Sequence, residues 1–212
     1  MRIISLGSIC SVARQLDLLD MCQASLPFDW VRTPDFETIL DLIESRFDKY
    51  LVIDNFIFVK DSDKFPLGID AGDMTSTHSA VYRHKLFNIT FFHDFTSDLS
   101  LEEQFDEFCV KHQRRIDRFY QVLMEEKNLL FVRDDIKRRV NNEHITRFFT
   151  ILSSINRDLD AKLLLIVHNP KKIKLNIVTC GQVTVYDDHA ELGEWWRPNV
   201  PWKELFLRCI SC

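Results

Sequence analysis

The sequence predicts an α/β fold, in which a mainly parallel sheet has helices on both of its faces. Two observations indicate this class. Short apolar runs alternate along the chain with segments whose apolar residues recur at helical spacing. Strands separated by amphipathic helices are typical of parallel sheets that are covered on both sides. Five glycines, six prolines and no internal repeat give no sign of a linker, so residues 1–212 are expected to form a single domain.

The first half of the chain begins with an apolar strand and two helices. Residues 2–6 predict a buried strand, and residues 10–21 predict a helix after the turn at Gly7. A second helix is expected from Pro34 to about residue 47, because apolar residues share one helical face there. Residues 51–60 alternate as in a strand. The stretch from Asp61 to His84 is rich in Gly, Pro, Ser, Thr and Asp, which predicts a long loop that covers an active site as a mobile lid.

The second half of the chain continues the alternation. A strand at 86–92 precedes the longest predicted helix, 101–127, where apolar residues recur at i, i+3, i+4 and i+7 and His112 is expected to pack in the core. The remaining elements are a strand at 129–133, a helix at 141–155, a strand at 162–168, one or two strands within 176–186, and a helix from about Trp202. Trp195, Trp196 and Trp202 are expected to cover the core. A three-layer, Rossmann-like arrangement is the expected architecture.

Composition and charge argue against several classes of protein. A net charge of −5 with mixed signs argues against a binder of nucleic acid or of membrane surfaces. No stretch reaches the roughly 18 apolar residues of a membrane span, and the N-terminal run contains Arg14 and lacks a small-residue cleavage site. Six cysteines without paired metal-ligand spacing are consistent with reduced thiols. We therefore expect a cytoplasmic protein without a metal or other cofactor.

Polar residues of catalytic type follow the predicted strands. Ligands of open α/β sheets bind at the carboxyl ends of the strands. In chain order these ends carry Ser8 and Cys10; His93 and Asp94; Arg133, Asp134 and Asp135; His168 and Asn169; and Asp187, Asp188 and His189. Because the set combines a nucleophile with bases and acids, the sequence predicts an active site at this edge of the sheet.

Cys10 is the leading candidate for a nucleophile. It lies at the start of a predicted helix, where unpaired N–H groups and the positive end of the helix dipole favour a thiolate over a thiol. The same N–H groups, together with the Ser8 hydroxyl, are suited to hold an oxyanion. The alternative is a packing role, since free cysteine is among the most buried residue types.

The order of several motifs resembles a known family. Ser5-Leu6-Gly7-Ser8-x-Cys10-x-x-Ala13 is followed by Pro27-Phe28-Asp29-Trp30, by Phe92-His93-Asp94-Phe95, and by a long helix with Arg114-Arg115-Ile116 before Leu130-Phe131-Val132-Arg133. From residue 2 to about residue 135 the chain resembles the papain-like cysteine peptidase family, an uncharacterised domain of bacteria and large DNA viruses. The C-terminal third matches loosely, through its Trp-rich end. The resemblance implies Cys10 as nucleophile, His93 as base, Asp94 or another acid to orient the imidazole, and an α+β papain-like fold as the alternative architecture.

Two members of this implied triad have alternatives. Asp94 adjoins His93 on an extended segment, where neighbouring side chains point to opposite faces, so Asp29 and Asp187 are alternatives for the acid. The acidic block that ends at His189 is similar to the Asp-x-x-His block of small esterases, although its spacing is one residue short. His189 is therefore an alternative to His93 as the base.

Four residues near these motifs are candidates for substrate binding: Ser8, Asp29, Trp30 and Arg133. Asp29 either binds substrate or caps a turn that its aromatic neighbours anchor to the core. Arg133 is either an ion-pair partner of Asp134 or Asp29, or a group that binds a carboxylate or phosphate of the substrate.

The function predicted from these features is that of a cysteine-dependent hydrolase or related acyl-transfer enzyme acting on a peptide, amide or ester. The alternative is a Rossmann-like domain that binds or transfers a nucleotide or glycan, in which Cys10 is only a buried residue. Residues 6–10 lack the glycine-rich phosphate-binding motif that such a domain uses.

Overall fold

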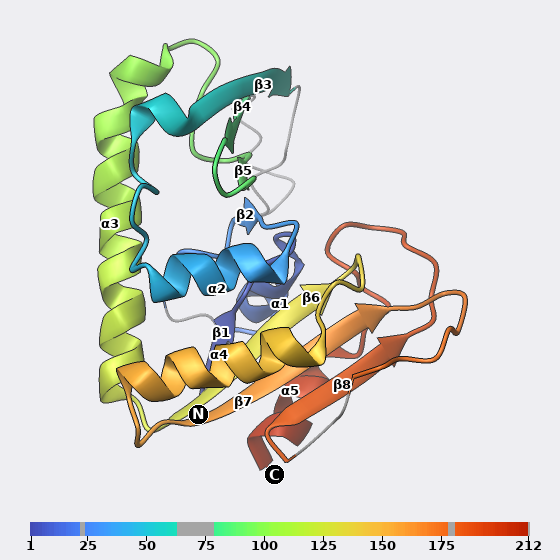
Figure 1. Ribbon diagram of the computed structural model, residues 1–212. Helices are drawn as coiled ribbons and strands as arrows, with labels where there is room; N and C mark the ends of the chain where they lie inside the picture. Colours follow the sequence, from blue (N-terminus) through green and yellow to red (C-terminus); the bar gives the residue numbers. More distant parts are fainter. Residues whose placement is uncertain (22–23, 63–78, 178–180, 212) are drawn as a thin grey trace.

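The computed structural model describes residues 1–21, 24–62, 79–177 and 181–211, and within them two four-stranded sheets (Figure 1). The first sheet is parallel, with the order β1-β6-β7-β8 formed by Arg2–Ser5, Asn128–Asp135, Asp160–His168 and Val183–Asp188. The second is antiparallel, with the order β2-β5-β4-β3 formed by Val31–Arg32, Thr90–Phe91, Ser79–His84 and Phe56–Ser62. A mixed α/β fold is confirmed. The expectation of one mainly parallel sheet is corrected by the second sheet, and this division of strands does not establish the Rossmann-like form.

The antiparallel sheet arises where short connections join successive strands. β4 pairs with β5 across residues 85–89, and so short a link cannot hold the helical crossover that parallel strands need. A 3-10 turn, η1 (Ile53–Asn55), precedes β3. The predicted loop at 61–84 is wrong at both ends, since residues 61–62 complete β3 and Ser79–His84 form β4. The rest of the predicted lid, residues 63–78, lies outside the described residues.

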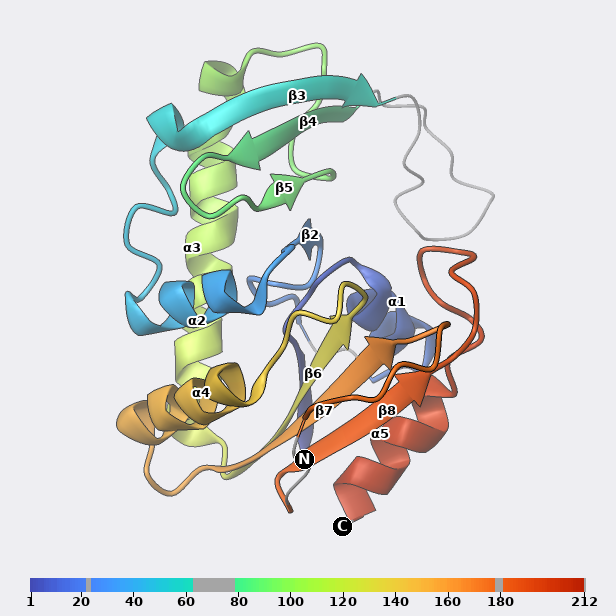
Figure 2. The same cartoon turned by 45° about the vertical axis from the view of Figure 1, so that its right-hand side comes forward.

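Helices cover both faces of the parallel sheet. α2 (Phe36–Glu44) and α4 (Asn142–Ile155) lie on one face, and α1 (Ser11–Leu18) and α5 (Trp202–Ser211) lie on the other (Figures 1 and 2). The strand sequence explains this, because successive side chains of a strand point to opposite faces. In β6, Leu129 and Phe131 belong to the core with α2 and α4, whereas Leu130 and Val132 belong to the core with α1 and α5.

The long helix α3 (Leu101–Glu125) packs against parts of both sheets. A capping box begins it, and at about 1.5 Å per residue its length is about 37 Å. Near its start Phe108 packs edge-on against Phe91 of the antiparallel sheet, and nearer its end Phe119 packs against Phe28. Figure 1 shows the helix running past both sheets. One core cluster therefore includes residues of both sheets.

A buried arginine joins the two sheets. Arg133 on β6 is 1% exposed and donates hydrogen bonds to the Leu6 carbonyl (2.9 Å), the Thr33 hydroxyl (2.7 Å) and the Thr33 carbonyl (2.9 Å). Thr33 follows β2 directly, and its hydroxyl also accepts a hydrogen bond from the Ser8 N–H at 2.9 Å. The guanidinium lies 5.8 Å from the centre of the Phe36 ring. Arg133 and Thr33 thus fix the end of β1 relative to the antiparallel sheet.

The turn between β1 and α1 depends on this contact. Gly7 has φ +68°, and a Cβ at this position would lie 2.7 Å from the Thr33 hydroxyl oxygen. Ser8 also has a positive φ, of 93°, which costs about 1–3 kcal/mol in a residue with a side chain. Close packing against Thr33 holds the turn in this conformation and directs the chain into α1 at Cys10.

We expect Thr33→Val to lower the free energy of unfolding by about 2–3 kcal/mol, because the Ser8 N–H and an Arg133 N–H lose their acceptor while they remain buried. Chemical denaturation measures this change. Thr150→Val is the matched control, since the Thr150 hydroxyl bonds only the Thr146 carbonyl on the exposed side of α4 and its loss should cost less than about 0.5 kcal/mol. Equal effects of the two substitutions would contradict the role given to Thr33.

Candidate active site

Cys10 lies between the end of β1 and the first turn of α1. It occupies the N-cap position of the helix, where its side chain makes no capping hydrogen bond. The first N–H groups of an α-helix have no intrahelical acceptor, so they remain available to a group bound beside the thiol. The thiol is largely buried, with 9% of the residue exposed.

His93 approaches Cys10 from the other sheet. It follows β5, which pairs with β2 and so lies next to the segment that Thr33 ties to the Cys10 turn. The Cys10 Sγ and the His93 Nε2 are 3.9 Å apart. The Trp30 ring meets the imidazole edge-on, with 6.4 Å between the ring centres. Cys10, His93 and Trp30, all singled out in the sequence, therefore lie together.

Burial determines the protonation state of this pair. It raises the pKa of the Cys10 thiol to about 12, and the charges of Asp94 and Asp29 act in the same direction. Burial also lowers the pKa of His93, and the charge of Asp94 opposes this only in part. Burial therefore opposes the thiolate that the helix N-terminus was expected to favour. Both shifts favour a neutral thiol beside a neutral imidazole.

Asp94, the residue after His93, belongs to a buried hydrogen-bond network. Its Oδ1 accepts hydrogen bonds from Lys111 Nζ at 2.6 Å and His112 Nε2 at 3.2 Å, and His112 Nδ1 lies 3.3 Å from the Tyr50 hydroxyl. Burial alone would raise the pKa of Asp94, but His112 and Lys111 hold that pKa well below its usual range. Asp94 thus acts on His93 through its negative charge, which raises the pKa of the imidazole. The expected core position of His112 is confirmed, since it is fully buried.

The candidate substrate-binding residues have different surroundings. Asp29 is buried and its Oδ2 accepts a hydrogen bond from the Leu26 N–H at 2.6 Å, so it closes a turn. Burial raises the pKa of Asp29 to about 6. Ser8 is buried beside Thr33. Arg133 bonds to Thr33 in the interior, and this structural role replaces the ion-pair and anion-binding roles considered for it.

The alternative base, His189, lies at the end of β8 with its own partners. Its Nε2 is 3.7 Å from Asp187 Oδ2, and its Nδ1 is 3.0 Å from the Asn169 carbonyl oxygen. The histidine that the structure brings to Cys10 is His93. The pair of Asp187 and His189 at the end of β8 therefore contacts the backbone at Asn169, after β7.

A cavity of about 490 Å³ lies beside the Cys10–His93 pair. Its lining comes from the turn after β1, from the antiparallel sheet and the residues after β5, and from the segment between β8 and α5: Ile9, Cys10, Arg32, Val59, Lys60, Val81, Arg83, Thr90, Phe92, His93 and Trp195. Sequence reasoning missed Arg32, Lys60 and Arg83, and it assigned Trp195 to the core, although 39% of Trp195 is exposed. The β-branched and aromatic pair Val81-Tyr82 was the available signal for a strand, within a stretch that was interpreted as a loop.

The segment that carries Trp195 is anchored by a second buried arginine. Arg197 forms ion pairs with Asp134 at the end of β6 and with Asp188 at the end of β8. Asp134 also accepts a hydrogen bond from the Ser11 hydroxyl at 2.6 Å, which links the network to α1. Figure 2 shows this segment, residues 189–201, extending from the parallel sheet toward the antiparallel sheet. Asp134 and Asp188, at the ends of β6 and β8, therefore fix the segment that brings Trp195 to the cavity.

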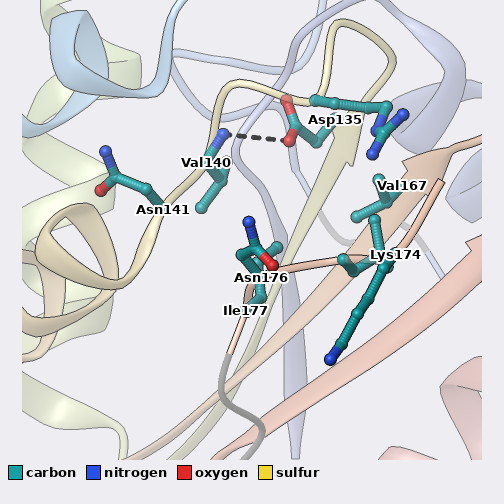
Figure 3. Close-up of a pocket in the computed structure, with 9 residues that line it drawn as sticks. Asp135, Val140, Asn141, Val167, Lys174, Asn176 and Ile177 are labelled. Carbon is teal, nitrogen blue, oxygen red and sulfur yellow. Dashed lines mark hydrogen bonds between the residues drawn. The ribbon is translucent and has the colours of Figure 1, made fainter.

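A smaller cavity of about 180 Å³ lies at the ends of β6 and β7 (Figure 3). Asp135 lines it, and the Asp135 carboxylate accepts a hydrogen bond from the Val140 N–H at 3.0 Å. That carboxylate therefore braces its own loop, and this cavity shares no lining residue with the one at Cys10. Within the described ranges, no group of three or more His, Cys, Asp or Glu residues is placed to hold a metal ion. None of the described helices is both long and apolar enough to span a membrane.

On this mixed α/β fold, a cysteine and a histidine meet at a cavity in the arrangement of nucleophile and base that cysteine hydrolases use. The chain belongs to the family described as "Putative papain-like cysteine peptidase (DUF1796)", whose model matches residues 1–171. The chain is also similar to "Uncharacterized protein R408" of Acanthamoeba polyphaga mimivirus, with 31% identity over 216 residues and 96% of each chain covered. No solved structure matches the chain. The family resemblance drawn from the N-terminal motifs is confirmed.

We expect the rate of alkylation of Cys10 by iodoacetamide to rise about tenfold with each pH unit from about pH 6 to about pH 9, because a thiol with a raised pKa is far from full ionisation throughout. Mass spectrometry of the Cys10 peptide measures this rate. N-acetylcysteine amide is the control, and its rate should level off above the ordinary thiol pKa of about 8.5. A rate at Cys10 that stays constant between about pH 5 and pH 7 would instead reveal a thiolate–imidazolium pair.

Proposed function

We propose that this protein is a cysteine-dependent hydrolase that cleaves a peptide or related amide, with Cys10 as the nucleophile and His93 as the base. The observation that carries the proposal is the 3.9 Å approach of Cys10 Sγ to His93 Nε2 beside a cavity of about 490 Å³. The name of the family supports a peptide substrate. Reduced cysteines at positions 10, 109 and 209 are consistent with a cytoplasmic location, which is part of the proposal.

The chemistry starts from a neutral thiol and a neutral imidazole. His93 Nε2 takes the proton of the Cys10 thiol as Sγ forms a bond to the substrate carbonyl carbon, and the carbonyl oxygen becomes an oxyanion. The C–N bond then breaks, and His93 returns the proton to the leaving amine. Water, deprotonated by His93, attacks the thioester and releases the acid and the free thiol. A lowered pKa of His93 keeps the imidazole unprotonated, as a base must be.

Two features of the surroundings favour these steps. The unpaired N–H groups at the start of α1 are suited to stabilise the oxyanion. In known enzymes, one such donor lowers the activation barrier by about 3–4 kcal/mol. Asp94 carries its negative charge beside His93, which stabilises the imidazolium that forms during the reaction. We therefore assign Asp94 as an electrostatic residue, and Trp30 packs edge-on against the imidazole.

The proposal is tested by incubating the protein with a mixture of proteome-derived peptides and detecting new peptide ends by mass spectrometry. We expect cleavage by the native chain, its loss in Cys10→Ala, and a fall of about 10²–10⁴-fold in His93→Ala, which is the usual contribution of a general base. Circular dichroism and thermal melting establish that both variants remain folded.

The variant His189→Ala distinguishes the two candidate bases, because His189 has its own partners, Asp187 and Asn169, at the end of β8. It is expected to cleave as fast as the native chain. Loss of cleavage in His189→Ala with retention in His93→Ala would overturn the assignment of the base. Cleavage that persists in Cys10→Ala would remove the cysteine mechanism and leave the binding-domain alternative.

A further inference from the structure

Three cations line the cavity on the face of the antiparallel sheet that is turned toward Cys10. Strand pairing explains why they share this face, because residues directly opposite each other in neighbouring strands point the same way. Arg32 on β2 and Arg83 on β4 are both opposite Thr90 on β5. Lys60 on β3 is opposite Val81, two residues before Arg83 and therefore on the same face. All three cations are exposed at the cavity.

The spacing of the two arginines suits a single acidic group. Neighbouring strands lie about 4.8 Å apart, so the backbones of Arg32 and Arg83 are separated by about 10 Å, with Thr90 between them. Long side chains from the two flanking strands can reach one anion above the Thr90 hydroxyl. Arginine is also the side chain best suited to two-pronged contact with a carboxylate or phosphate.

Among the described residues, no carboxylate balances these charges at the cavity. The described lining contains no Asp or Glu, and within the same part of the chain Arg32, Lys60 and Arg83 take part in none of the ion pairs. The two acids whose charges act on the thiol, Asp29 and Asp94, are buried, and they bond to the Leu26 N–H and to Lys111, respectively. The cavity is therefore locally positive although the whole chain has a net charge of −5.

We propose that the cavity beside Cys10 binds a peptide segment that carries a carboxylate or phosphate group, held by Arg32 and Arg83 over Thr90 with Lys60 alongside. This inference rests on the proposed function for the position of the scissile bond and adds the chemical class of the substrate. Acidic groups next to the cleaved amide would direct substrate binding. Because the whole protein has a negative net charge, a preference for anions at this cavity would come from the local cations and not from the overall charge.

The first experiment compares alkylation of Cys10 by iodoacetate and by iodoacetamide, two reagents of similar size that differ in charge. The ratio of the iodoacetate rate constant to the iodoacetamide rate constant is expected to be higher at Cys10 than at N-acetylcysteine amide, a thiol without a neighbouring charge. Arg83→Gln and Arg32→Gln should each lower it by about threefold to fivefold, as for a partly screened ion pair. Arg208→Gln removes the same charge from an exposed position on α5 and should leave the ratio unchanged. Raising the salt concentration should reduce the native ratio toward that of the Gln variants.

The second experiment measures binding without any reaction at the thiol. Calorimetry with the Cys10→Ser protein compares blocked peptides in which alanine alternates with glutamate, with glutamine or with phosphoserine. Tighter binding of the glutamate or phosphoserine peptide than of the glutamine peptide, with the difference lost in Arg83→Gln, supports the proposal, and the stronger of the two identifies the anionic group. Equal binding of all three peptides overturns it.

The two proposals fail in different ways. A charge preference in both experiments without peptide cleavage would contradict the hydrolase but leave the anion site standing. Cleavage that is lost in Cys10→Ala yet indifferent to acidic residues, with the same alkylation ratio in native and Arg83→Gln proteins, would support the hydrolase and overturn the anion site.

Discussion

The candidate site depends on the hydrogen bonds between Arg133 and Thr33. Cys10 comes from the end of a parallel strand and His93 from the end of an antiparallel one, so their distance is set by how the two sheets are joined. Arg133 belongs to the parallel sheet and Thr33 follows the antiparallel one, while the Thr33 hydroxyl also binds the Ser8 N–H in the Cys10 turn. Burying guanidinium N–H groups without partners is costly, and the three hydrogen bonds from the terminal nitrogens of Arg133 keep the junction in one geometry.

In the proposed mechanism, burial favours a reaction different from that of an ion-pair cysteine enzyme. A neutral thiol beside a neutral imidazole would hold the nucleophile inactive until a carbonyl lies within reach and proton transfer can accompany attack. Substrate that fills the cavity would displace water and strengthen every charge interaction there. In the proposed site the cations on the sheet face act on the substrate, whereas the buried Asp94 acts on His93.

Local patterns predicted much of this molecule, and long-range pairing accounts for what they missed. The helices at 101–127 and 141–155 were predicted within two residues of their ends, because capping groups and apolar faces are local features. The motif resemblance gave Cys10 and His93, which the structure brings within 3.9 Å. The predicted strands at 51–60 and 86–92 overlap β3 and β5, but the second sheet was missed because β2 has only two residues and β4 lies in a stretch interpreted as a loop. The partners of Arg133 were missed because a distance of 100 residues separates it from Thr33.

Features that destabilise the folded chain gather around one cavity. Ser8 has an unfavourable positive φ, the Cys10 thiol is largely buried, and three cations share one sheet face without a carboxylate among the described lining residues. The stabilising contribution lies elsewhere, in the aromatic packing along α3, where Phe108 and Phe119 join cores of both sheets. A fold under selection for stability alone has no reason to concentrate strain, desolvation and like charge at a single opening. Their coincidence at the Cys10–His93 pair is therefore an argument for function that is independent of any motif.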